Sequence, residues 1–285
     1  MIHEKYSVSE KKGGHHNMNN NNITYIYQCE DSTDGILTAV YDAWASRRGH
    51  SHIKLQILRE ADTMELFSEY IPVQTDAEKA EKVRRSVLRK ISTEAWEMVF
   101  RASLSNQDEK ADLIYRFLVG GFYYGAPVTK MMAEPVVMRM TELARSVSNE
   151  AHEWKQFIRF DEQAGRILFA RFRPKNHVIF SVAAHFADRL SGENFLILDT
   201  GRSIAAVHPA GQNWYLAPLS EADADAAFSS QPDEYRDLWK TFFDSIAIKE
   251  RTNPKLQQNM MPLRYREYAV EFGRRVQVDG RILES

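Results

Sequence analysis

A loose group of polar residues between positions 149 and 189 carries the strongest signal for chemistry in this sequence. Asn149, His152, Lys155 and Gln156 recur at intervals of one, three and four residues, so on a helix they form one polar stripe. More basic residues and histidines follow this stripe: Arg159, Arg171, Lys175, His177, His185 and Arg189. Histidines beside lysine and arginine suit phosphate binding or acid–base catalysis.

These residues support two functional hypotheses. In the catalytic one, His152 and His185 are the acid and the base, and Lys155 or Arg159 stabilises developing negative charge. In the binding one, the basic residues contact the phosphates of a nucleic acid: Lys155, Arg159, Arg171, Lys175, His177 and Arg189. The structural alternative is that each side chain caps a helix or satisfies a buried carbonyl group. No histidine pair has metal-ligand spacing, so we expect neither a metal nor another cofactor.

Residues 246–268, IAIKERTNPKLQQNMMPLRYREY, form a second candidate site. They hold five basic residues against two acidic ones, and Pro254 and Pro262 interrupt any long helix. Planar donors next to aromatic rings suit phosphates and bases, so we expect nucleic-acid contacts from Arg251, Asn253, Arg264 and Tyr265. Trp214 is a further candidate for base stacking, although aromatic residues in strands are more often part of a core. The alternative for the segment is a clamp that holds the last helix against the body.

Common catalytic motifs are missing. The sequence has no glycine-rich phosphate loop, no HExxH zinc helix and no GxSxG nucleophile elbow. Cys29 is the only cysteine, which excludes an intrachain disulfide and an all-cysteine metal or iron–sulfur site.

The overall composition is that of an ordinary globular protein: 285 residues, 44% hydrophobic and 27% charged, with a net charge of −2. Nucleic-acid binding would therefore need a local basic patch and not a global positive field. No apolar run is long enough to span a bilayer, so we expect no membrane partner. The first residues lack the apolar core of a signal peptide, and we expect a cytoplasmic location.

The first half of the chain is predicted to be mostly helical. Residues 1–22 form an Asn-rich tail without core-forming residues. Residues 23–29 and 53–58 are predicted strands, with a helix over 36–44 between them. Helical patterns run from a capping box at 75–78 to about residue 125, and another helix spans 135–157.

The second half changes character. A hairpin is expected over 157–160 and 167–172, then a helix over 179–190 and short strands over 195–198, 203–208 and 213–216. Helices over 234–246 and 262–272 close the fold before a loose tail, 273–285. The order predicts the α+β class: a mostly helical body with a small antiparallel sheet. We expect one domain over 23–272, with a helical part (about 75–157), a β-meander part (about 157–217) and closing helices (234–272).

Six blocks of sequence, in order, resemble one bacterial family. The blocks are DGILTAVYDA (34–43), TDAEKA (75–80), EAHEWKQFIRF (150–160), AHFADR (184–189), LWKTFF (238–243) and ERTNPKLQ (250–257). The family consists of proteins described as DNA metabolism or DNA repair proteins and is built on a domain of unknown function. The resemblance covers about residues 23–270.

The resemblance implies a context for function and no catalytic residues. Such proteins are typically encoded beside a radical S-adenosylmethionine (radical SAM) protein with a helix-hairpin-helix element, and some are fused to a uracil-DNA-glycosylase-like domain. It therefore implies an accessory module for DNA repair that binds DNA or a damaged base and works with these partners. Two alternatives remain open: an enzyme that uses the His152 and His185 pocket, and a protein–protein adaptor without nucleic-acid contact.

Overall fold

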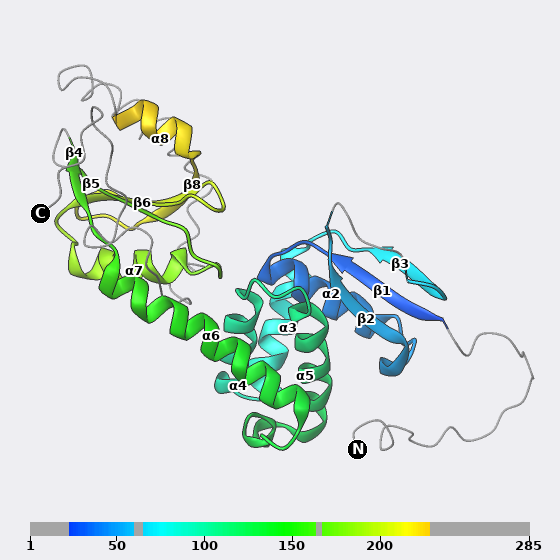
Figure 1. Ribbon diagram of the computed structural model, residues 1–285. Coiled ribbons are helices and arrows are strands. Elements are labelled where there is room, and N and C mark those ends of the chain that lie inside the picture. Colours follow the sequence, from blue (N-terminus) through cyan, green and yellow to red (C-terminus); the bar gives the residue numbers. More distant parts are fainter. Residues whose placement is uncertain (1–22, 60–64, 164–166, 229–285) are drawn as a thin grey trace, which may run out of the picture.

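The computed structural model describes residues 23–59, 65–163 and 167–228, which form two lobes joined by one long helix (Figure 1). The joining helix is α6 (Pro135–Phe157). Its first half contributes Val137, Met140 and Leu143 to the hydrophobic core of the first lobe. Its second half contributes Val147, Ala151 and Trp154 to a core of the second lobe. The helix has the bounds that the sequence predicts, because Pro135 suits a first helical position and apolar residues recur at helical spacing.

The first lobe contains a small parallel sheet. Its order is β2-β1-β3, formed by Thr24–Cys29 (β1), Ile53–Ile57 (β2) and Ser68–Pro72 (β3). Helix α2 (Thr33–Ala45) and the 3-10 turn η1 (His50–His52) connect β1 to β2. Tyr27, opposite Leu55 in the register, lies in the same core as Ile36 and Leu37 of α2. The β1–α2–β2 segment is thus a βαβ unit, whose crossover helix requires its two strands to be parallel.

Helices complete the first lobe: Ala77–Lys90 (α3), Thr93–Ser103 (α4), Lys110–Tyr124 (α5) and the 3-10 helix Ala126–Lys130 (η2). The sequence predicts nearly continuous helix here, and the structure adds breaks before Thr93 and before Lys110. The side chain of Ser92 accepts from the backbone N–H of Ala95 and so begins α4. The predicted capping box is wrong in its cap residue. Asp76, and not Thr75, accepts from the N–H groups of Glu78 and Lys79.

The second lobe is a five-stranded mixed sheet covered on both faces. Its order is β4-β5-β6-β7-β8, formed by Asp161–Gln163 (β4), Ile167–Phe172 (β5), Asn194–Asp199 (β6), Ile204–His208 (β7) and Tyr215–Pro218 (β8). Helix α7 (Ile179–Arg189) covers one face and α8 (Glu221–Phe228) the other (Figure 1). Alternate strand residues face each helix: Ala170 and Phe172 share a core with α7, and Phe169 shares one with α8.

The α+β class is confirmed, but the sheets are not purely antiparallel. The hairpin β4–β5 and the pairs β6–β7 and β7–β8 are antiparallel, whereas β5 and β6 are parallel because α7 carries the chain back between them. Both neighbours of β1 are parallel to it as well. The sequence does not predict β3 or α8. The two closing helices and the two tails that it does predict lie outside the described residues.

The turn from β1 into α2 requires glycine at position 35. A Cβ atom added there would lie 2.6 Å from the carbonyl oxygen of Glu30. We expect Gly35→Ala to lower the free energy of unfolding by roughly 1–3 kcal/mol, because backbone must move to relieve the clash. Gly120→Ala within α5 is the matched control, since its Cβ would meet only Val128, at 3.9 Å. Urea denaturation of both variants measures this; equal midpoints for the two would contradict it.

Candidate functional site

The predicted polar residues of segment 149–189 divide among three places in the structure. Lys155, on the last turns of α6, lies next to α7, which carries His185 and Arg189. Arg171 lies on the other face of the second sheet. Lys175 and His177 lie in the loop between β5 and α7, where the two lobes meet.

The first place, Lys155 with His185 and Arg189, is called the α6–α7 basic cluster below. Burial lowers the pKa of His185, and the charges of Lys155 and Arg189 lower it further, against an opposing effect of Asp188. Burial also lowers the pKa of the half-buried Lys155. The side chains of Lys155 and Arg189 form no ion pair with any described residue. Two charged side chains, those of Lys155 and Arg189, therefore lie beside His185 without an ion-pair partner among the described residues, an arrangement that suits an anionic ligand.

Two residues that the sequence predicts in this cluster, His152 and Arg159, form no described contact with His185. His152 is exposed one turn before Lys155 on α6, and no hydrogen bond links it to His185 among the described residues. The prediction that Arg159 lies on a strand of the hairpin is wrong. The residue lies between α6 and β4, and its guanidinium donates to the carbonyl oxygens of Gln156 (2.7 Å) and Ile158 (3.3 Å).

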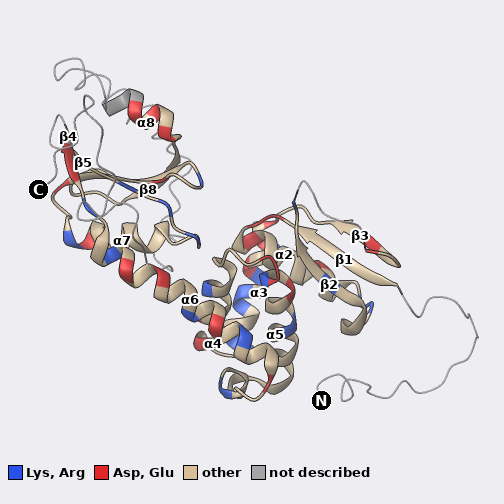
Figure 2. Cartoon of the chain, in the orientation of Figure 1, with Lys and Arg blue, Asp and Glu red and all other residues tan. Residues whose placement is uncertain are grey.

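Arg171 is held by the face of the sheet opposite α7. It alternates with Ala170 and Phe172 along β5, so its side chain lies with Phe169, 5.0 Å from the ring centroid. Its guanidinium forms ion pairs with Asp225 and, at 3.7 Å, with Glu221, both on α8. Figure 2 shows acidic positions along α8. Because successive side chains of a strand point to opposite faces of the sheet, Arg171 lies on the face opposite α7 and is separated from the α6–α7 basic cluster.

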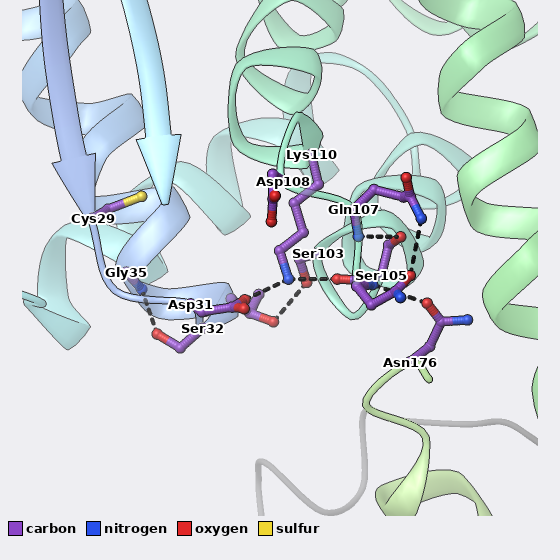
Figure 3. A network of polar contacts seen from close by, with 12 residues as sticks. Cys29, Asp31, Ser32, Gly35, Ser103, Ser105, Gln107, Asp108, Lys110 and Asn176 are labelled. Carbon is purple, nitrogen blue, oxygen red and sulfur yellow. Dashed lines mark hydrogen bonds and ion pairs between the residues drawn. The ribbon is translucent and has the colours of Figure 1, made fainter. Parts of the chain in front are cut away.

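The third place is a polar junction between the lobes (Figure 3). Lys110, the first residue of α5, is only 3% exposed, and its ammonium group donates to the Asp31 carboxylate and to the Ser105 carbonyl oxygen. Burial lowers the pKa of Lys110, and the charge of Asp31 opposes that effect. From the second lobe, the side-chain oxygen of Asn176 accepts from the backbone of Asn106 at 2.9 Å.

His177 and Arg202 belong to the same junction. The backbone N–H of His177 donates to the carbonyl oxygen of Leu104 across the lobes. Burial, with the positive charges of Arg202 and Lys110, lowers the pKa of His177 to about 4, so the ring is neutral at neutral pH. Arg202, which follows β6, donates to the carbonyl oxygens of Pro174 (3.2 Å) and Lys175 (2.7 Å).

The charges of the junction are compensated from within. Asp31 offsets Lys110, Asp199 offsets Arg202, and Asp108 pairs with Arg59, which follows β2. The Glu150 carboxylate accepts from the backbone N–H groups of Lys175 and Asn176 at the approach to α7. Carboxyl ends of parallel strands from both sheets meet here, a common location for ligands, but the internal pairing makes the junction a polar seam between the lobes.

Sequence reasoning missed Lys110 and Arg202 and assigned Asp31 only to a turn. One signal was available for Lys110. A lysine in the first turn of a helix is unfavourable next to the positive end of the helix dipole, and so implies a specific partner.

The remaining predicted residues divide between buried and undescribed positions. Trp214 is 7% exposed and packs in the core shared with α7, in agreement with the alternative that it is a core residue and not a base-stacking one. Cys29 is buried at the end of β1, and burial raises the pKa of its thiol to about 12, so it is not a thiolate nucleophile. Arg251, Asn253, Arg264 and Tyr265 lie outside the described residues. Within the described residues, no histidine, cysteine, aspartate and glutamate side chains gather into a metal site.

A family model described as a domain of unknown function, DUF4130, matches residues 108–271, more than half of the chain. The chain belongs to the DUF4130 family. The matched DUF4130 region begins just before α5 and includes Lys110, all of α6 and the second lobe. It thus contains the whole α6–α7 basic cluster, while Asp31 and the parallel sheet precede it. No curated protein matches the chain, and no described helix is long and apolar enough to cross a membrane.

The neutral His177 gives the DUF4130 domain an expected dependence of stability on pH. Its pKa is about 4 in the fold, against 6.5 for an unperturbed histidine. Between these values the unfolded chain binds a proton that the folded chain does not. The free energy of unfolding should therefore fall by roughly 3 kcal/mol from pH 6.5 to pH 4 through this group. Urea denaturation across this range should show a smaller fall in His177→Gln; parallel profiles would contradict the assignment.

Proposed function

We propose that this DUF4130 protein is a DNA-binding accessory module for DNA repair and that the α6–α7 basic cluster contacts the phosphate backbone. One observation carries the proposal: Lys155 and Arg189 form no ion pair with a described residue, and both lie close enough to His185 to add to the effect of burial in lowering its pKa, against the opposing effect of Asp188. A phosphate would give Lys155 and Arg189 the ion-pair partner that they lack among the described residues. Basic and acidic positions alternate along α6 (Figure 2), so binding would depend on this local cluster.

The chemistry of the cluster suits backbone contacts better than base recognition. An exposed arginine and a half-buried lysine are donors without acceptors, as phosphate oxygens require. Such contacts position a protein on DNA without reading its sequence. Arg171 is not part of this proposed surface, because Asp225 and Glu221 hold it on the opposite face of the sheet.

We further propose that any radical chemistry belongs to a partner. Cys29 is the only cysteine, so this chain lacks the cysteines for an iron–sulfur cluster of its own. The resemblance of its sequence blocks to DNA repair proteins supports a radical SAM helix-hairpin-helix protein as that partner, and a uracil-DNA-glycosylase-like protein as a second one. An adaptor without DNA contact would bind such a partner and no oligonucleotide.

A catalytic role is the second candidate, and the lowered pKa of His185 favours it. A histidine that is neutral at neutral pH can act as a general base, and Lys155 beside it could stabilise negative charge. In that case His185→Gln would abolish conversion of a bound oligonucleotide and leave its binding nearly unchanged.

The test of DNA binding is to replace Lys155 by alanine and measure affinity for single-stranded, duplex and uracil-containing oligonucleotides at several salt concentrations. We expect several-fold weaker binding and a plot of log affinity against log salt that is flatter by about one unit for each lost contact.

Arg139→Ala on the same helix is the matched control. Arg139 is already paired with Glu109 (2.6 Å) and Glu142 (3.0 Å), so its removal should leave binding unchanged. Equal losses in the two variants would point to a general effect of charge and contradict a specific site. Absence of binding at low salt would leave the adaptor alternative.

A further inference from the structure

A second surface of the first lobe combines exposed aromatic rings with basic side chains. It lies at the carboxyl ends of α2, α3 and α5, and we call it the aromatic end surface. Trp44 is 36% exposed, Tyr123 69% and Tyr124 39%, and Phe122 is half-buried beside them. Large exposed aromatic side chains gathered at one place are unusual on a protein surface without a partner.

The fold holds Trp44 on a fixed support. Its ring centroid lies 4.5 Å from that of His50, 5.2 Å from Phe122 and 6.4 Å from Tyr115. Tyr115 is fully buried, and its hydroxyl is 2.7 Å from Nδ1 of His50. Arg116 fixes the same loop by donating to the carbonyl oxygen of His50 at 2.6 Å. A stacking platform positioned in this way loses little conformational freedom on binding.

None of these neighbouring rings stacks face to face on Trp44. The interplanar angles are 58° with His50, 79° with Phe122 and 73° with Tyr115. The neighbours therefore support the indole at steep angles and do not provide the parallel contact that a planar ligand could make.

Basic residues at the same helix ends lack acidic partners. Lys90, the last residue of α3, has its amino nitrogen 6.0 Å from the Phe122 ring centroid. Arg47, Arg89 and Lys90 are exposed, and none forms an ion pair with a described residue. Two acids of α2 and β3 are engaged with other residues: Asp42 with Lys79 at 2.7 Å, and Glu69 with Arg48 at 3.6 Å. Lys90 and Arg89 also offset the negative end of the α3 dipole, a role that requires no ligand.

We propose that the aromatic end surface binds a single-stranded nucleic acid, with bases stacked on Trp44 and Tyr124 and phosphates next to Arg47, Arg89 and Lys90. Unpaired bases offer the planar faces that exposed aromatic side chains recognise, and basic residues between the rings follow the backbone. A duplex keeps its bases stacked on one another, so it could use only the basic residues.

This surface is separate from the α6–α7 basic cluster. Phe122, Tyr123 and Tyr124 form the end of the 15-residue α5, whose first residue, Lys110, lies in the junction with the second lobe. At 1.5 Å per residue, the two ends of α5 are about 20 Å apart. The inference uses the DNA-handling role proposed above only as context, and its variants are different.

Binding of fluorescein-labelled oligothymidine, oligouridine and a DNA duplex, followed by fluorescence anisotropy, tests the proposal. Trp44→Leu and Tyr124→Ala should each weaken single-strand binding by about tenfold and leave duplex binding nearly unchanged. Tyr124→Phe keeps the ring and should bind as the parent does. Lys90→Gln should flatten the salt dependence by about one unit. The two labelled single strands distinguish DNA from RNA as the preferred ligand.

Met138→Ala is the control, because Met138 is an apolar side chain of α6 that is 46% exposed elsewhere, and it should change nothing. Tyr124, at an exposed helix end, keeps the test valid if Trp44→Leu fails to fold by circular dichroism. Unchanged single-strand affinity in Tyr124→Ala and Trp44→Leu overturns the proposal. If Lys155→Ala weakens binding and these two do not, the α6–α7 proposal stands and this one fails. If the aromatic variants lose single-strand affinity and Lys155→Ala does not, this proposal stands and the α6–α7 proposal fails.

Discussion

The two lobes depend on one helix that belongs to both hydrophobic cores. Val137, Met140 and Leu143 of α6 pack in the first core, and Val147, Ala151 and Trp154 pack in the second. Burial of an apolar side chain contributes on the order of 1–3 kcal/mol, so each half of α6 is anchored by several such contributions. A helix anchored at both ends fixes where its last turns lie. The anchoring of α6 in both cores thus places Lys155 beside α7.

In the polar junction between the lobes, the positively charged side chains of Lys110 and Arg202 are each paired with a residue of opposite charge. A buried ammonium group such as that of Lys110 costs free energy unless an anion and hydrogen bonds compensate it. Asp31 and the Ser105 carbonyl oxygen do so, and Asp199 does the same for Arg202. In the α6–α7 basic cluster, Lys155 and Arg189 form no such ion pair with a described residue. The junction is interpreted as structural because the charges of Lys110 and Arg202 are paired. The α6–α7 basic cluster is a candidate binding surface because Lys155 and Arg189 are not paired with described residues.

Sequence reasoning predicted local structure well where one element determines its own pattern. The bounds of α6, the strands near residues 53, 167 and 204, and α7 all follow from apolar periodicity and from turn residues. Whether two strands are parallel depends on both of them and not on the pattern of either one. The turns around β6 resemble those of a meander, so the sequence does not predict that β5 and β6 are parallel. The sequence also placed Arg171 with the histidines. The alternation along β5 was readable, but which face α7 covers depends on the assembled sheet. The pairing of Lys110 with Asp31 joins residues far apart in the chain and could not be read locally.

The limits of the family match have a consequence for how this protein is divided into modules. The DUF4130 match begins at residue 108, within the first lobe. Ile114, Phe117 and Leu118 of α5, inside the match, share one core with Ile36 and Leu55, which precede it. The leading helix of the matched stretch therefore packs one apolar side against residues that precede the match. A segment cut at the start of the match would expose this side of α5, so the boundary of the family match is not a boundary of the hydrophobic core.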